Sequence, residues 1–283
     1  MSGSLGGLDF HEVPARSERT DWVSAGTSWT TNVTLPDEQS QRTALTAYRA
    51  RSVQEERWFG PVQRPRLLTT STVFRGDGDA ISALIPGWGD SGTAHEGDTL
   101  GSQAVDNTLR LYQGDTLVGE ANRYQPMMAS RTLSPEPLPY RLVSENRRDA
   151  WAGPYSTATR TEWGFTSGRI SPGTLWWNPS LIQLDYAVDI DVDGRAKRNA
   201  DITVTALHLP TATEASAIRR VTLDVSYDDG VSWHHARLQH RGDGWRTRID
   251  APRTAGFVTL RTTARDARGN SVEQSITRAF GLR

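Results

Sequence analysis

The clearest structural signal in the sequence lies near the C-terminus. It reads Ile218-Arg-Arg-Val-Thr-Leu-Asp-Val-Ser-Tyr227, then Asp228-Asp229-Gly230, then Val231-Ser-Trp-His-His-Ala-Arg-Leu238. Apolar and polar residues alternate along the first run, which is the pattern of a β-strand with one buried face. Asp and Gly favour a tight turn, because they tolerate the backbone angles that a turn needs. The stretch therefore predicts a β-hairpin.

Similar runs follow and precede this hairpin at a spacing of about 8–12 residues. We expect strands at 201–207, 244–249, 256–265 and 271–280. Short strands at this spacing predict a sandwich of about seven strands in about 100 residues. The expected inward-facing set is Val221, Leu223, Val225, Val258, Leu260, Val272 and Ile276.

The N-terminal half also carries strand signals. A short apolar run covers 79–86, and a hairpin turning at Gly114 joins 107–112 to 116–119. Two further strands are expected at 140–145 and 159–165. The segment nearest to a helical pattern, 39–51, is rich in Thr and Arg and does not predict a helix.

These signals predict an all-β chain of two antiparallel β-sandwich domains. Residues 1–7, Gly-rich and without a basic or apolar region, are interpreted as a linker or cloning remnant and not as a signal peptide. The first domain is placed at 8–168 and a Gly- and Pro-containing linker at 169–173. The second domain, 174–283, is expected to be immunoglobulin- or fibronectin-like.

Composition excludes several classes of function. The chain has 283 residues, 32 basic and 33 acidic side chains, ten Trp and no Cys. Without Cys there is no disulfide, thiolate zinc site or cysteine nucleophile. A formal net charge of −1 argues against a nucleic-acid partner, which needs a basic surface. No apolar run approaches the roughly 18 residues of a membrane span, so no membrane insertion is expected.

Two short motifs contain a serine that could act as a nucleophile. Gly89-Asp-Ser91-Gly92 is similar to the serine motif of trypsin-like peptidases, and Gly26-Thr-Ser28 to the serine segment of subtilisins. A serine nucleophile needs a histidine base held by an acid. The surrounding segments that would supply these partners in either class are missing, so we favour a Gly-rich loop in both places and no catalytic residue.

Three aspartates, Asp189, Asp191 and Asp193, precede Gly194 and match the opening of a calcium loop. The twelfth position of such a loop should be a bidentate Glu, and here it is Ala200. Calcium is therefore a weak candidate cofactor, and we favour the interpretation of this segment as a solvated acidic turn. The six His residues show no metal-binding spacing, and structural roles are expected for them.

The turn that follows the expected strand at 218–227 matches a known sequence motif. Ser226-Tyr-Asp-Asp-Gly-Val-Ser-Trp233 matches the Asp box, Ser-x-Asp-x-Gly-x-Ser/Thr-Trp. In this reading Asp228 accepts backbone N–H bonds, Gly230 takes a positive φ and Trp233 packs under the turn. β-Propellers repeat the motif once per blade. A single copy argues against a propeller and for a folding device.

Exposed aromatic rings can stack on sugars, so the tryptophans could form a glycan-binding surface. Trp88, Trp176 and Trp177 are the candidates. Most tryptophans are core residues, and that is the favoured alternative.

The C-terminal half also resembles a known family. The runs Val221–Trp233, Gly256–Arg261, Ala264–Gln274 and Arg278–Arg283 are similar to the extreme C-terminus of large secreted subtilisin-type serine peptidases of actinobacteria. The N-terminal half is similar to the region that precedes it in such chains. That similarity rests on Thr20–Gly26, on Glu56-Arg-Trp-Phe-Gly-Pro61 and on the hairpin at Gly114.

The resemblance implies an extracellular protein whose parent hydrolyses peptide bonds. The catalytic residues of that family lie in a protease domain that this chain does not contain, so none is carried over. The sequence thus suggests a non-catalytic accessory region that stabilises, spaces or docks the protease domain on substrate or surface. A glycan- or polymer-binding module is the alternative. An independent hydrolase would require Ser28 or Ser91 within reach of a His. The expected partners are the parent's protease domain and a protein or polysaccharide substrate.

Overall fold

The structure is a computed structural model and is built from strands. It describes residues 12, 14, 17–35, 39–66, 73–90, 95–98, 105–122, 127–149 and 153–283. No helix occurs in these ranges. The strands of the first half are β1 (Ser28–Trp29), β2 (Asn32–Thr34), β3 (Ser40–Thr43), β4 (Thr46–Ala47), β5 (Val73–Gly76), β6 (Ile81–Leu84), β7 (His95–Asp98), β8 (Val105–Gln113), β9 (Thr116–Asn122), β10 (Met127–Ala129), β11 (Leu138–Arg148) and β12 (Ala158–Ser167). The strands of the second half are β13 (Trp176–Trp177), β14 (Ile182–Val188), β15 (Arg195–Ala196), β16 (Asp201–His208), β17 (Ile218–Ser226), β18 (His234–Ala236), β19 (Gln239–Arg241), β20 (Gly244–Arg248), β21 (Phe257–Asp266) and β22 (Ser271–Leu282).

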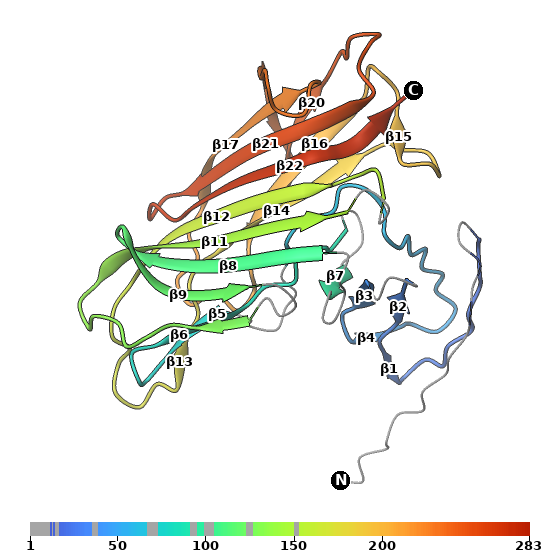
Figure 1. Cartoon of the computed structure of the whole chain (residues 1–283). Coiled ribbons are helices and arrows are strands. Elements are labelled where there is room, and N and C mark those ends of the chain that lie inside the picture. Colours follow the sequence, from blue (N-terminus) through green and yellow to red (C-terminus); the bar gives the residue numbers. More distant parts are fainter. Residues whose placement is uncertain are drawn as a thin grey trace.

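One large sheet organises the molecule. Its strand order is β18-β17-β21-β22-β12-β11-β8-β9, and β15 adds to β22 as a parallel neighbour (Figure 1). The other pairings in this sheet are antiparallel. The expectation of an all-β, antiparallel chain is confirmed. The arrangement of the sheets as two sandwiches, the second of them immunoglobulin-like, stays a prediction.

The large sheet runs through both halves of the sequence. β12 pairs with β22 from Ala158↔Thr277 to Gly164↔Ser271, so strands from before and after residues 169–173 are hydrogen-bonded neighbours. A second link between the halves comes from β13, which pairs with β5. The division at 169–173 stays a prediction, and strand pairing crosses it in two places.

Smaller sheets cover one side of the large sheet. β14-β16-β20-β19 lies behind β17, β21 and β22 in Figure 1. The hydroxyl of Tyr186 in β14 donates to Gln274 of β22 at 3.0 Å, and the indole of Trp163 in β12 donates to the carbonyl of Ile182 at 2.9 Å. The remaining sheets are β10-β6-β5-β13, β2-β3-β7 and β1-β4.

The core forms where the alternating faces of these strands meet. All seven residues expected to point inward are buried, and Leu223, Val258, Leu260 and Ile276 have no exposed surface. They belong to one apolar cluster with residues of β14 and β16, such as Ile182 and Val204. The hairpin expected at Gly114 is also confirmed: β8 and β9 pair on either side of it, and Gly114 has φ +57°.

The turn after β17 shows why its residues favour a hairpin. The carboxylate of Asp228 accepts the backbone N–H of Ser232 at 2.9 Å and its hydroxyl at 2.6 Å. Gly230 has φ +94° and its N–H donates to the hydroxyl of Ser226 at 2.8 Å. The guanidinium of Arg261 lies 4.4 Å from the centre of the Trp233 ring. The hydrogen bonds that Asp228 accepts lower its pKa to about 2, with the Ser232 hydroxyl as the largest cause.

Candidate functional site

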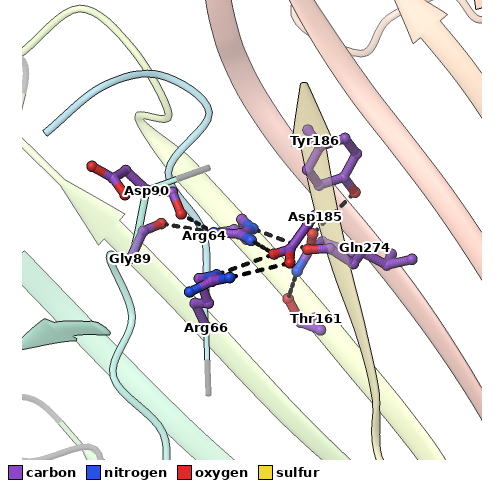
Figure 2. A network of polar contacts seen from close by, with 9 residues as sticks. Arg64, Arg66, Gly89, Asp90, Thr161, Asp185, Tyr186 and Gln274 are labelled. Atoms are coloured by element: carbon purple, nitrogen blue, oxygen red, sulfur yellow. Dashed lines mark hydrogen bonds and ion pairs between the residues drawn. The ribbon is translucent and has the colours of Figure 1, made fainter. Parts of the chain in front are cut away.

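A fully buried arginine lies at the centre of the most extensive polar cluster. Nε of Arg64 donates to the carbonyl of Leu184 at 3.1 Å, and Nη1 donates to the carbonyls of Gly89 at 3.1 Å and Asp90 at 2.6 Å. Nη2 forms an ion pair with Asp185 (Figure 2). A buried charge is tolerated only when it is paired and hydrogen-bonded, and Arg64 meets both conditions.

Asp185 is held by two arginines. Arg66 donates to both of its carboxylate oxygens, from Nε at 3.1 Å and from Nη2 at 3.2 Å, and Figure 2 shows Arg64 and Arg66 converging on it. Burial would raise the pKa of Asp185, but the two guanidinium groups outweigh it and hold that pKa below its usual value. The carboxylate therefore stays ionised at neutral pH.

The cluster continues into the large sheet. Tyr186 follows Asp185 in β14 and donates to Gln274 of β22, whose amide donates to the hydroxyl of Thr161 in β12 at 2.8 Å (Figure 2). Burial raises the pKa of Tyr186, so its phenol stays protonated and acts as a donor. One chain of polar contacts thus connects the loop segment around Arg64 with three strands.

A buried histidine lies beside this cluster. Nδ1 of His95 is 3.1 Å from Asp90 Oδ2, and its Nε2 is 3.0 Å from Glu56 Oε2. Its ring stacks on Trp58 at a centroid separation of 3.9 Å and an interplanar angle of 7°. Each ring nitrogen of His95 therefore faces a carboxylate oxygen, and Glu56 is the partly exposed end of the trio.

A second group of side chains holds the loop segments around residues 59–64 and Trp88 in place. The amide of Gln41 donates to the carbonyl of Trp88 at 2.9 Å, and its oxygen accepts the N–H of Phe59 at 2.8 Å. Arg148 donates to Gln63 at 2.6 Å and lies 4.8 Å from the Trp88 ring centre. These contacts add to the antiparallel bridge between Arg64 and Gly89, through which the two loop segments pair directly.

The serines singled out from the sequence are not part of this cluster. Ser28 is exposed on β1, and no hydrogen bond joins it to a histidine in the part of the chain that the structure describes. Ser91 lies outside the described residues, although Asp90 and His95 on either side of it are described. The other described histidines lie elsewhere: His235 is 3.0 Å from Asp224, and the ring of His240 is 4.7 Å from that of Trp245.

The three candidate calcium ligands form a turn. Asp191 Oδ1 accepts the backbone N–H groups of Asp193 at 3.0 Å and Arg195 at 2.9 Å, and Oδ2 is 3.4 Å from the Arg283 guanidinium. The N–H of Arg195 is the largest cause that lowers the pKa of Asp191. Within the described ranges, no three His, Asp or Glu side chains are grouped so that they could hold a metal ion. Calcium binding at Asp189, Asp191 and Asp193 stays a prediction.

The candidate tryptophans are in different environments. Trp88 is 2% exposed, so it is a core residue and cannot stack on a ligand as considered from the sequence. Trp176 is 56% exposed and Trp177 is half-buried, both on β13. Phe74 of β5 is also exposed, at 37%.

Sequence reasoning missed the Arg64 cluster. Its members are far apart in the chain, and Arg64 in Gln63-Arg-Pro65 has the composition of a surface loop. A comparison with models of known protein families finds no match, and a comparison with curated proteins finds none either. Nothing helical in the described residues has the length and apolarity to cross a membrane.

Proposed function

We propose that this chain is a non-catalytic accessory region of a secreted subtilisin-type serine peptidase, which stabilises the protease domain or docks it on substrate or surface. The sequence resemblance described above, strongest after about residue 175, supports the assignment to this class and an extracellular location. The proposal includes two β-sandwich units, the second immunoglobulin-like, and an Asp-box hairpin at residues 226–233.

The hydrogen bonds of Arg64 are the main support for a non-catalytic role. Each of its nitrogens donates to the protein itself, two of them to backbone carbonyls. A substrate-binding arginine keeps donors free for its ligand, whereas one that joins β14 to the 89–90 segment holds the fold together. Both ring nitrogens of His95 are likewise occupied by carboxylates, those of Asp90 and Glu56. A general base needs one nitrogen facing the group that it deprotonates.

A hydrolysis assay tests this part of the proposal. The purified chain is incubated with casein, and in parallel with a fluorophosphonate probe that labels activated serines. We expect no turnover and no labelling. Stoichiometric labelling of Ser28 or Ser91 would overturn the non-catalytic assignment and identify the nucleophile by peptide mapping.

A polymer-binding module is the second candidate, and the exposed side chains on β13 and β5 favour it. Trp176 pairs with Gly76, which has no side chain, and nothing lies within 4 Å of where its Cβ would be. Phe74 is two residues from Gly76 and so projects from the same face, as a diagonal neighbour of Trp176. Two aromatic side chains with open space between them suit stacking on a sugar ring.

Retention on insoluble polymers tests this candidate. The chain is mixed with chitin, cellulose and insoluble elastin, and the bound fraction is measured. We expect Trp176→Ala to reduce binding several-fold, while Trp22→Ala, which removes a side chain that is 95% exposed elsewhere, leaves it unchanged. Equal retention of both variants, or no binding to any polymer, would remove this candidate.

A further inference from the structure

A polar groove lies on the outer face of the large sheet, away from the buried cluster. It has a volume of about 420 Å³, and its lining residues come from β17, β21, β22 and β12, near the end of β17 that follows residue 217. Its lining includes Arg220, Arg265, Glu273 and Glu162, with hydroxyl-bearing residues between them. This volume is within the range of small-molecule sites.

Two arginines lie side by side in the lining of the groove. Arg220 and Arg265 are directly opposite in the antiparallel β17–β21 pair, and both are exposed. The register shifts between Ile218 and Arg220, so Arg219 is the extra residue of a β-bulge and is exposed as well. Like charges directly opposite in a sheet destabilise it, and bulges commonly re-aim side chains at functional positions. Three positive charges thus lie close together, although the repulsion between Arg220 and Arg265 alone already disfavours this pairing.

Several neighbouring charges on the same face are paired, but these three arginines are not. Glu162 lies 2.6 Å from Arg160 and 3.5 Å from Arg141, and Arg261 lies 3.0 Å from Asp224. Across the ranges that the structure describes, no carboxylate lies within ion-pair distance of Arg219, Arg220 or Arg265. In a chain whose net charge is −1, this is a local excess of unpaired guanidinium groups.

The rest of the lining limits how much negative charge the ligand places inside the groove. Arginine binds carboxylates and phosphates through parallel N–H donors. Glu273 and Glu162 are directly opposite each other one row along the sheet, and they would repel a second negative charge placed beside them in the groove. A single carboxylate is therefore favoured over a phosphate dianion.

The same lining indicates what else the ligand carries. The hydroxyls of Thr222 and Thr263 lie 2.6 Å apart, and Ser271 borders the groove beside Arg265. Glu273 accepts hydrogen bonds and donates none when ionised. A ligand rich in hydroxyl groups satisfies both kinds of partner.

We propose that this groove binds a sugar acid, such as a uronate residue of an acidic polysaccharide, with its carboxylate on Arg220 and Arg265. Its hydroxyl groups then meet Glu273 and the threonine and serine side chains, while Arg219 contacts a neighbouring carboxylate of the polymer. The site is distinct from the exposed Trp176, and the inference does not depend on attachment to a peptidase.

Calorimetric titration of the full chain with a galacturonate trimer tests the proposal. Binding is compared with that of the methyl-esterified trimer, triglutamate and inorganic phosphate. We expect the galacturonate trimer to bind most tightly and the ester to lose binding. Arg220→Ala and Arg265→Ala should each weaken binding about tenfold or more, because each removes a charge-assisted hydrogen bond. Arg248→Ala, which removes an exposed charge from β20, should not.

The stability of the variants provides a second readout. Because Arg220 and Arg265 repel each other, either alanine variant should unfold at the same urea concentration as the parent or a higher one. Equal binding of the ester, binding of phosphate or triglutamate as tight as that of the sugar acid, no binding of the trimer, or a similar loss in the Arg248 variant would each overturn the proposal.

Discussion

At the scale of single residues, Arg64 illustrates how a charge becomes part of a core. Its donors are used by three backbone carbonyls and Asp185, so truncation would remove the side-chain donor from each of these acceptors and leave Asp185 with Arg66 as its remaining guanidinium partner. We predict that Arg64→Met lowers the free energy of unfolding by about 3–5 kcal/mol, the usual cost of breaking a buried ion pair. The Arg268–Glu214 pair, more than half exposed on both sides, provides the control. Arg268→Ala should cost about 0–1 kcal/mol in urea unfolding. Equal effects would mean that solvent reaches Arg64.

A second residue-scale prediction concerns Asp228. Its pKa is about 2 in the folded chain, below the ordinary value of 3.8. A lowered pKa in the folded state adds stability above the unfolded-state pKa, and this contribution disappears as the pH falls toward 2. The urea midpoint of the parent should therefore exceed that of Asp228→Asn at pH 6, and the difference should shrink between pH 4 and 2. Carbon NMR of the carboxyl group measures the pKa directly. A midpoint difference that does not change with pH would contradict this account.

At the scale of elements, the close approach of β7 to the segment before Asp90 depends on a glycine. A Cβ at Gly97 would lie 2.2 Å from the backbone carbon of Trp88, and backbone cannot move aside as a flexible side chain can. We predict that Gly97→Ala displaces β7 and lowers the melting temperature by several degrees. Gly78→Ala is the matched control, because nothing lies within 4 Å of its Cβ position. Similar melting temperatures for the two variants would show that β7 does not pack as described.

Many strands and the hairpin at Gly114 were predictable, but β14 and the pairing of strands far apart in the chain were not. The alternation of apolar and polar residues identified β17 and β22, because in a strand with one buried face every second residue is apolar. The pairing of β12 with β22 joins residues more than a hundred positions apart, and a pattern of period two contains no information about which strand lies alongside. The same limit applies to Arg64 and Asp185: each has an ordinary local sequence, and the fold alone brings them together.

At the scale of the whole molecule, the continuity of the large sheet determines how the chain unfolds. Separating residues 8–168 from 174–283 would expose β12 and β22 as unpaired edges and would remove β13 from β5. It would also break the hydrogen bond from Gln274 to Thr161. Unpaired, exposed edges favour aggregation, so neither half should remain soluble and folded when produced alone.

The intact chain should therefore unfold in one cooperative transition, with no plateau between the loss of its two halves. Scanning calorimetry tests this by comparing the calorimetric enthalpy with the van't Hoff enthalpy, which agree for a two-state process. Fluorine NMR of the chain labelled with fluorotryptophan gives separate signals for Trp163 in β12 and Trp245 in β20, and so reports on each half separately. Coincident midpoints are expected. Two separated midpoints would show instead that residues 169–173 join independently stable domains, and that the hydrogen bonds between β12 and β22 contribute little to either.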